Sequence, residues 1–145
     1  MKLNRILLAI ALVLALGLTA CGEDSEEYTK IEPALVEPID GTVFNRVTLT
    51  ERAAERLEVQ TRPVAEEQVD GNSRLVVPYA AIIYDINGGT WVYTNPAPLT
   101  FVRAPITIDF IDGDKVYLHD GPALGTEVAT VAVAELFGTD TGVGK

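Results

Sequence analysis

The feature that most constrains the fold is a series of short apolar runs, separated by turn residues, between residues 75 and 133. The clearest run extends from Thr100 to Phe110, where apolar and polar side chains alternate. One face holds Val102, Ala104, Ile106, Ile108 and Phe110, and the other holds Arg103, Thr107 and Asp109. Because successive side chains of a strand point to opposite faces, the pattern predicts a strand with one face on a core and one toward water.

The neighbouring runs have the composition of further strands. Asp112–Asp114 predicts a hairpin turn, since its central glycine tolerates a positive φ and aspartate caps its own backbone. Lys115–His119 is then the returning strand, and Glu127–Val133 is β-branched enough for a last one. Leu75–Tyr84 and Trp91–Thr94 supply earlier strands. We therefore expect a mostly β fold, a small antiparallel β-roll or barrel-like domain.

One short helix is expected before this series. Thr42–Leu49 alternates like a strand, and Thr50 is a good N-cap for a helix over Arg52–Leu57. Val59–Val64 predicts another strand, and Glu66–Ser73 predicts a polar loop.

The N-terminal stretch has the features of an export signal. Lys2 and Arg5 precede the apolar run Ile6–Leu16, which is shorter than the roughly 20 residues that cross a bilayer. Leu18-Thr19-Ala20-Cys21 resembles the lipobox of bacterial lipoproteins. That resemblance implies cleavage after residue 20 and a diacylglycerol thioether, usually with an added acyl chain, on Cys21. An ordinary secretory signal and an uncleaved membrane helix are the alternatives.

These features divide the chain into a signal at 1–20, a lipidated Cys21 with an acidic tether to residue 41, a β-domain at 42–137 and a flexible tail at 138–145. Without Lys2 and Arg5, nine of the eleven basic residues remain against twenty-one acidic residues, so the formal charge is −12. Such an acidic chain is a poor match for nucleic acid, because phosphates would repel it. We expect an extracytoplasmic protein anchored to a membrane by lipid.

The residues offer little for catalysis, and we expect no enzymatic activity. His119 is the only histidine, and neither Ser25 nor Ser73 lies in a nucleophile motif. No pair of histidines or cysteines exists to bind zinc or copper. Asp112 and Asp114 lack the further acids of a calcium loop. No catalytic residue, metal or cofactor is therefore predicted beyond the acyl lipid on Cys21.

Three aromatic residues are candidates for a partner or ligand surface. Trp91 and Tyr93 share one face of a predicted strand, and Tyr79 is near them in sequence. Aromatic side chains supply much of the binding energy at protein interfaces. In a small β-domain, however, such residues more often belong to the core.

Several segments together resemble the membrane-proximal domain of periplasmic adaptor subunits of RND-type efflux pumps, also called membrane fusion proteins. The resemblance rests on Val47–Leu57, Thr61–Val64, Val76–Ile82, Thr90–Tyr93, Phe101–Ile106, Asp112–Val116 and Gly121–Val128. It implies a domain that packs on the extracytoplasmic face of an inner-membrane transporter.

The chain also departs from that family. A full adaptor carries a β-barrel, a lipoyl-like domain and a helical hairpin between the two halves, whereas here only residues 65–74 separate them. Family members often have glycine where Glu58 stands, so the helix end is expected to differ. The chain by itself is therefore not expected to bridge two membranes.

Three hypotheses follow from these features. The first is a lipid-anchored interaction module that docks on a membrane transporter, RND-type or another efflux component, or on its adaptor. The second is a lipoprotein that senses or binds a small ligand through its aromatic face. The third is a relic of a degraded adaptor gene, which the intact signal and strand pattern disfavour.

Overall fold

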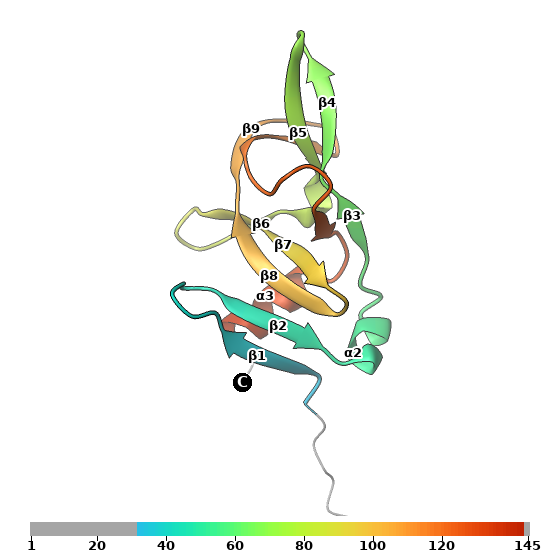
Figure 1. Ribbon diagram of the computed structural model, residues 1–145, viewed down its shortest axis with the longest axis vertical. Coiled ribbons are helices and arrows are strands. Elements are labelled where there is room, and N and C mark those ends of the chain that lie inside the picture. The colour runs from blue at the N-terminus through green and yellow to red at the C-terminus, as the bar shows by residue number, and fades with distance from the viewer. Residues whose placement is uncertain (1–31, 144–145) are drawn as a thin grey trace, which may run out of the picture. The chain divides into compact units, whose positions relative to one another are not determined.

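The computed structural model describes residues 32–143, so the predicted signal, Cys21 and most of the predicted tether lie outside the described residues (Figure 1). The described residues are mostly β, as predicted, with two short α-helices and one 3-10 turn. The elements in order are β1 (Ala34–Pro38), β2 (Asn45–Leu49), α2 (Glu51–Arg56), β3 (Thr61–Pro63), β4 (Ala65–Val69), β5 (Asn72–Pro78), η1 (Tyr79–Ala81), β6 (Ile83–Tyr84), β7 (Thr90–Ala97), β8 (Thr100–Pro105), β9 (Thr107–Asp112), β10 (Lys115–Asp120), β11 (Glu127–Ala129) and α3 (Val133–Thr141).

The strands form two antiparallel sheets. The seven-stranded sheet has the order β1-β2-β8-β7-β11-β3, with β6 paired to β7, and the four-stranded sheet has the order β4-β5-β10-β9. Among the described residues neither sheet closes into a barrel, which corrects the barrel-like expectation. The expected turn at Asp112–Asp114 is confirmed, since it joins β9 to β10 with Gly113 at φ 61°.

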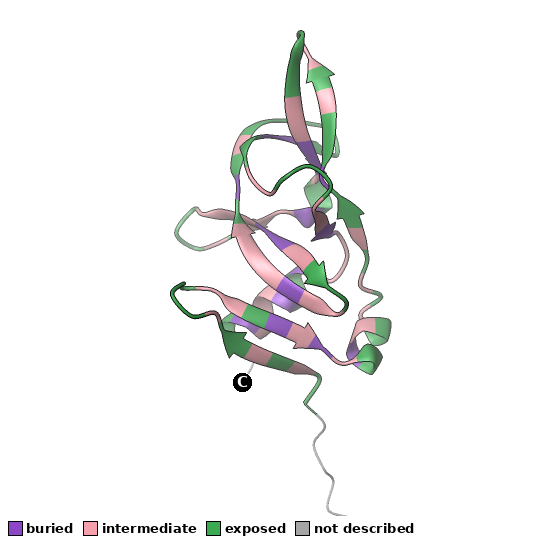
Figure 2. Cartoon of the chain, viewed as in Figure 1, coloured by how far each residue is buried: buried purple, intermediate pink, exposed green. Residues whose placement is uncertain are grey.

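Two apolar cores lie on opposite faces of the seven-stranded sheet. Strand β7 contributes to both, because Tyr93 and its neighbour Val92 point to opposite faces and both are fully buried (Figure 2). Tyr93 packs with Leu136 of α3 in the first core. Val92 packs with Val116 of the four-stranded sheet in the second. The architecture is therefore three-layered, with α3, the larger sheet and the smaller sheet in that order.

The predicted strand over Thr100–Phe110 is instead two strands in different sheets. Pro105 has no backbone N–H to continue the ladder with β7. The next residue, Ile106, donates its N–H to the Thr90 carbonyl at 3.0 Å and buries its side chain in the second core. The chain thus crosses between the sheets at Ile106.

The predicted faces of this run are confirmed only in part. Ala104, Ile106 and Ile108 lie in or against the second core, as predicted, but the opposite face of β8 does not meet water. Phe101 and Arg103 share a face of β8, where Phe101 is buried in the first core and the Arg103 side chain is only 16% exposed. Phe110, expected in the core, is exposed on β9. Strand β8 is thus covered on both faces, by the first core at Phe101 and by the second core at Ala104.

The predicted polar loop over Glu66–Ser73 is a β-hairpin of β4 and β5. Asp70 and Gly71, at φ 51° and 79°, form its two-residue turn, and Val69 pairs with Asn72. Two consecutive residues at positive φ give the turn whose twist matches that of a hairpin. The strand pattern was hidden because most of the β4 side chains are exposed and polar.

The short helix is confirmed as α2. The Thr50 hydroxyl accepts a hydrogen bond from Ala53 N at 3.2 Å, and Ala53 is the buried residue of this helix. After the C-cap, Glu58 adopts a left-handed conformation at φ 51°. Glycine adopts this conformation without steric cost. Glu58 thus has the backbone conformation that a glycine would have at this helix end, although glutamate is less suited to it.

Both predicted flexible flanks contain regular structure. Residues 34–38 of the predicted tether form β1, whose Ala34 and Val36 pack against the first core. The predicted strand over Glu127–Val133 ends at Ala129, and the predicted loose tail begins inside α3. Leu136 is fully buried, so packing against the sheet stabilises a helix whose own sequence is a poor helix former. Within residues 32–143, no helix is long and apolar enough to cross a membrane.

Candidate functional site: a buried ion pair and two linked loops

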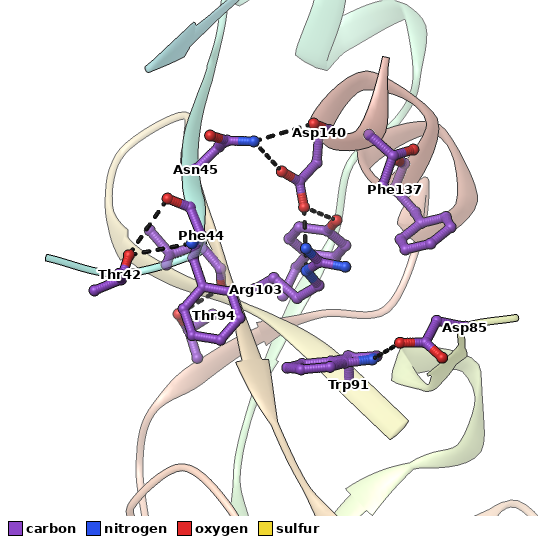
Figure 3. Close-up of polar contacts among 12 residues, drawn as sticks. Thr42, Phe44, Asn45, Asp85, Trp91, Thr94, Arg103, Phe137 and Asp140 are labelled. Atoms are coloured by element: carbon purple, nitrogen blue, oxygen red, sulfur yellow. Dashed lines mark hydrogen bonds and ion pairs between the residues drawn. The ribbon is translucent and has the colours of Figure 1, made fainter. Parts of the chain in front are cut away.

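A polar cluster lies between the seven-stranded sheet and α3, centred on the buried carboxylate of Asp140 (Figure 3). The Tyr93 hydroxyl donates a hydrogen bond of 2.7 Å to Asp140 Oδ2. The Asn45 amide donates to Asp140 Oδ1 at 3.0 Å and to its backbone carbonyl at 3.2 Å. Strands β2 and β7 thus both bind the last turn of α3.

Arg103 supplies the positive charge beside this carboxylate. Its Nε lies 3.3 Å from Asp140 Oδ2, close enough for an ion pair but without hydrogen-bond geometry. The guanidinium carbon is 5.0 Å from the centre of the Trp91 ring and 5.8 Å from those of Phe44 and Phe137. Three aromatic rings therefore surround the arginine, an arrangement that stabilises a partly desolvated cation.

The register of the sheet explains why these residues meet. Tyr93 of β7 lies directly opposite Arg103 of β8, and Trp91 lies two residues before Tyr93 on the same face. Burial raises the pKa of Tyr93 well above its ordinary value, and the hydrogen bond to Asp140 raises it further. Tyr93 is therefore a neutral hydrogen-bond donor at physiological pH.

Trp91 also links this cluster to the loop between β6 and β7. Its indole Nε1 donates to Asp85 Oδ2 at 2.9 Å, and its ring meets the Phe44 ring edge-on at 5.7 Å. Asp85 Oδ1 accepts from the backbone of Asn87 at 2.8 Å and of Gly89 at 2.9 Å. The Gly89, Trp91 and Asn87 hydrogen bonds, in that order of effect, hold the pKa of Asp85 below its ordinary value.

The three predicted surface aromatics occupy different environments. Tyr79 lies on η1 and is about half exposed, whereas Trp91 packs on Arg103 and Tyr93 is completely buried. Tyr79 and Tyr93 are thus not brought together in one surface. Cys21, the predicted lipidation site, lies outside the described residues.

No sequence pattern predicts a role for Arg103, Asp140 or Asn45. Asp140 falls in the predicted tail, and Arg103 falls on the predicted solvent face. The available sequence signal was Phe101. Arg103 lies two residues after it, on the same face of a strand, so an inward Phe101 would also point Arg103 inward. No local pattern points to Asp140, whose burial depends on the docking of α3.

A second cluster covers the outer face of the four-stranded sheet. Lys115 Nζ lies 2.7 Å from Glu67 Oε1, and the Tyr117 hydroxyl donates to Glu67 Oε2 at 3.0 Å. The Tyr117 ring stacks on that of Phe110, with centroids 4.3 Å apart. The Lys115–Glu67 pair is largely exposed whereas Tyr117 is buried, and together they tie β4 to β10.

Within the part of the chain that the structure describes, no group of three or more His, Cys, Asp or Glu side chains is placed to bind a metal ion. A surface depression beside α2 is lined by Ala54, Glu55, Glu58, Val59 and Gln60, none of which is aromatic. Comparison with protein-family models, curated proteins and solved structures gave no match to this chain.

Proposed function

We propose that this chain is a lipid-anchored extracytoplasmic interaction module, which docks on a membrane transporter or on the adaptor of one. Two sequence features support the proposal. The lipobox-like residues before Cys21 favour an anchor, and the segments between Val47 and Val128 resemble the membrane-proximal domain of efflux adaptors.

The structural observation that carries the proposal is a pair of exposed tyrosines, Tyr79 and Tyr84, on η1 and β6. Burial, and then the neighbouring Tyr79, raises the pKa of Tyr84 above its ordinary value. Tyrosine is enriched at protein interfaces because it offers a large apolar area and one polar tip. We call Tyr79 and Tyr84 the tyrosine pair.

The backbone around the tyrosine pair is well fixed. Tyr79 N donates to the Asp114 carbonyl at 2.7 Å, and Ile82 N donates to the Tyr79 carbonyl at 3.1 Å. A side chain on a fixed backbone loses less conformational freedom when it binds, which favours affinity. The tyrosine pair is therefore a suitable contact for a folded partner.

The ligand-binding alternative has less support. Trp91 and Tyr93, two of the aromatics that would line a ligand surface, are engaged by Arg103 and by the first core. A small-molecule site requires a concave surface with apolar walls. Trp91 and Tyr93 do not provide one, because the Trp91 ring is covered by Arg103 and Tyr93 is packed in the first core.

Site-specific crosslinking in cells tests the proposed docking. A photo-reactive amino acid replaces Tyr79 in the full chain, and a matched variant carries it at Leu124, another exposed apolar residue. We expect mass spectrometry to identify a transporter or adaptor component crosslinked from position 79 but not from position 124. Absence of any such component from position 79, in a chain that reaches the membrane, would contradict the proposal.

A further inference from the structure

Two loops carry aliphatic side chains that are almost completely exposed. Ile86, in the loop between β6 and β7, is 100% exposed, and Val43, in the loop between β1 and β2, is 86% exposed. Both loops extend to the left of the molecule in Figure 1 and are exposed in Figure 2. The contacts of Phe44 with Trp91 and of Trp91 with Asp85 place the two loops next to each other.

Internal hydrogen bonds fix the shape of each loop. Asp85 accepts from the backbone N–H groups on both sides of Gly88, so its side chain closes the turn that carries Ile86. Gly88 N also donates to the Asp85 carbonyl at 3.1 Å. In the other loop, the Thr42 hydroxyl accepts from Phe44 N at 3.1 Å and donates to the Ile39 carbonyl at 2.9 Å. The exposure of Val43 and Ile86 is thus a property of two well-defined turns.

The charge of the loops favours one kind of occupant. Residues 39–44 and 85–89 contain no lysine or arginine, and their only acids are Asp40 and Asp85. The Asp85 carboxylate is already engaged within its own turn and by Trp91. Asp40 is exposed in the same loop as Val43, so these loops match a zwitterionic lipid surface better than an anionic one.

The length of the chain before β1 brings such a surface within reach. Residues 22–33 separate Cys21 from β1, and the Pro33 carbonyl is fixed to the domain by Thr50 N at 3.0 Å. A chain of that length spans at most about 40 Å when fully extended. A lipid on Cys21 would therefore keep the loops close to the bilayer, at a high effective concentration relative to it.

We propose that Val43 and Ile86 insert into the acyl region of the bilayer and form a second, reversible membrane contact beside the lipid anchor. This inference rests on the anchor of the proposed function. Two aliphatic tips bind weakly alone, but the anchor turns their insertion into an intramolecular step. The contact orients the domain and places Tyr84, only two residues before Ile86, close to the lipid surface.

The test uses the lipidated full-length chain in vesicles of zwitterionic phosphatidylcholine. Cys21 is the only cysteine, so lipidation leaves no free thiol and a single new cysteine can be labelled with an environment-sensitive fluorophore. The labelled positions are Ile86→Cys, Val43→Cys and, as control, Leu124→Cys in the loop between β10 and β11. Lipids that carry a spin label in the acyl chain then quench any inserted fluorophore.

We expect a blue shift and strong quenching at positions 86 and 43, unchanged by added salt, and neither effect at position 124. Equal, weak quenching at all three positions would overturn the inference and leave the anchor intact. Burial of the fluorophore at position 86 in native membranes but not in pure lipid would also overturn it, because a protein would then be the occupant. Labelling of the parent chain at Cys21 would instead show that the anchor itself is absent.

Discussion

Tyr93 donates a hydrogen bond of 2.7 Å to Asp140, a residue 47 positions later in the chain. The bond joins the centre of the seven-stranded sheet to the last turn of α3. Because Tyr93 is fully buried, water cannot replace the lost partner if either group is removed. This contact is therefore one of those that hold α3 on the first core.

Tyr93→Phe removes the hydroxyl and keeps the ring. We expect the free energy of unfolding to fall by about 1–3 kcal/mol, because one lone pair of the buried Asp140 carboxylate loses its donor. Urea unfolding followed by circular dichroism measures the change. Tyr79→Phe is the matched control: the Tyr79 side chain is about half exposed, and its hydroxyl is expected to contribute no more than about 0.5 kcal/mol. Equal effects of the two substitutions would contradict the assigned role of Tyr93.

Arg103→Met tests the ion pair at the centre of the cluster. The substitution leaves the buried carboxylate of Asp140 without its cation, so we expect a loss of about 3–5 kcal/mol of stability. In a double-mutant cycle with Asp140→Asn, the two substitutions are expected to be non-additive by at least about 1 kcal/mol. Additive effects would mean that Arg103 acts only through its packing on Trp91 and the two phenylalanines.

The predictable parts of this fold are the ones with local causes. The Thr50 cap and the Asp112–Asp114 turn follow from residues next to one another, and the structure confirms both. The split at Ile106 depends on a partner strand in another sheet, and the burial of Asp140 depends on α3 meeting β2 and β7. Neither partner can be identified from the local alternation of polar and apolar residues. The polar cluster therefore cannot be predicted without the tertiary structure.

Thr50→Ala removes the N-cap of α2. The Thr50 hydroxyl accepts the otherwise free N–H of Ala53, so we expect a loss of about 1 kcal/mol of stability. Thr50→Ser keeps the hydroxyl and is the matched control, for which little change is expected. Denaturant unfolding of both variants measures the difference. If the two substitutions prove equivalent, the hydroxyl does not cap the helix.

The contact of Glu67 with Lys115 predicts a dependence of stability on pH. The Lys115 hydrogen bond, and then that of Tyr117, lower the pKa of Glu67 below its ordinary value of 4.5. The contact therefore stabilises the fold above pH 4.5, and this contribution is lost as the pH falls below 4.5 through the folded pKa.

Glu67→Gln removes that titration. We expect the difference in unfolding free energy between the parent chain and Glu67→Gln to be small at neutral pH, since the pair is exposed, and to narrow as the pH falls below 4.5. Unfolding curves recorded across this range measure the difference. Added salt at neutral pH should narrow it as well, because mobile ions screen exposed charges. A difference that stays constant with pH would show that Glu67 has no lowered pKa.

Gly89→Ala tests the link between the β6–β7 loop and the arginine cluster. A Cβ at Gly89 would lie 2.7 Å from Asp85 Oδ2 and 2.8 Å from Trp91 Nε1, too close for either atom to stay in place. We expect the hydrogen bond between those side chains to break, with a shift in the fluorescence of Trp91, the only tryptophan.

Gly138→Ala is the control, since its Cβ would meet only the Val143 carbonyl at 4.0 Å. Alanine inside α3 should leave the fluorescence unchanged and raise stability by about 0.5–1 kcal/mol. An unaltered spectrum in Gly89→Ala would mean that Asp85 does not hold Trp91 in place.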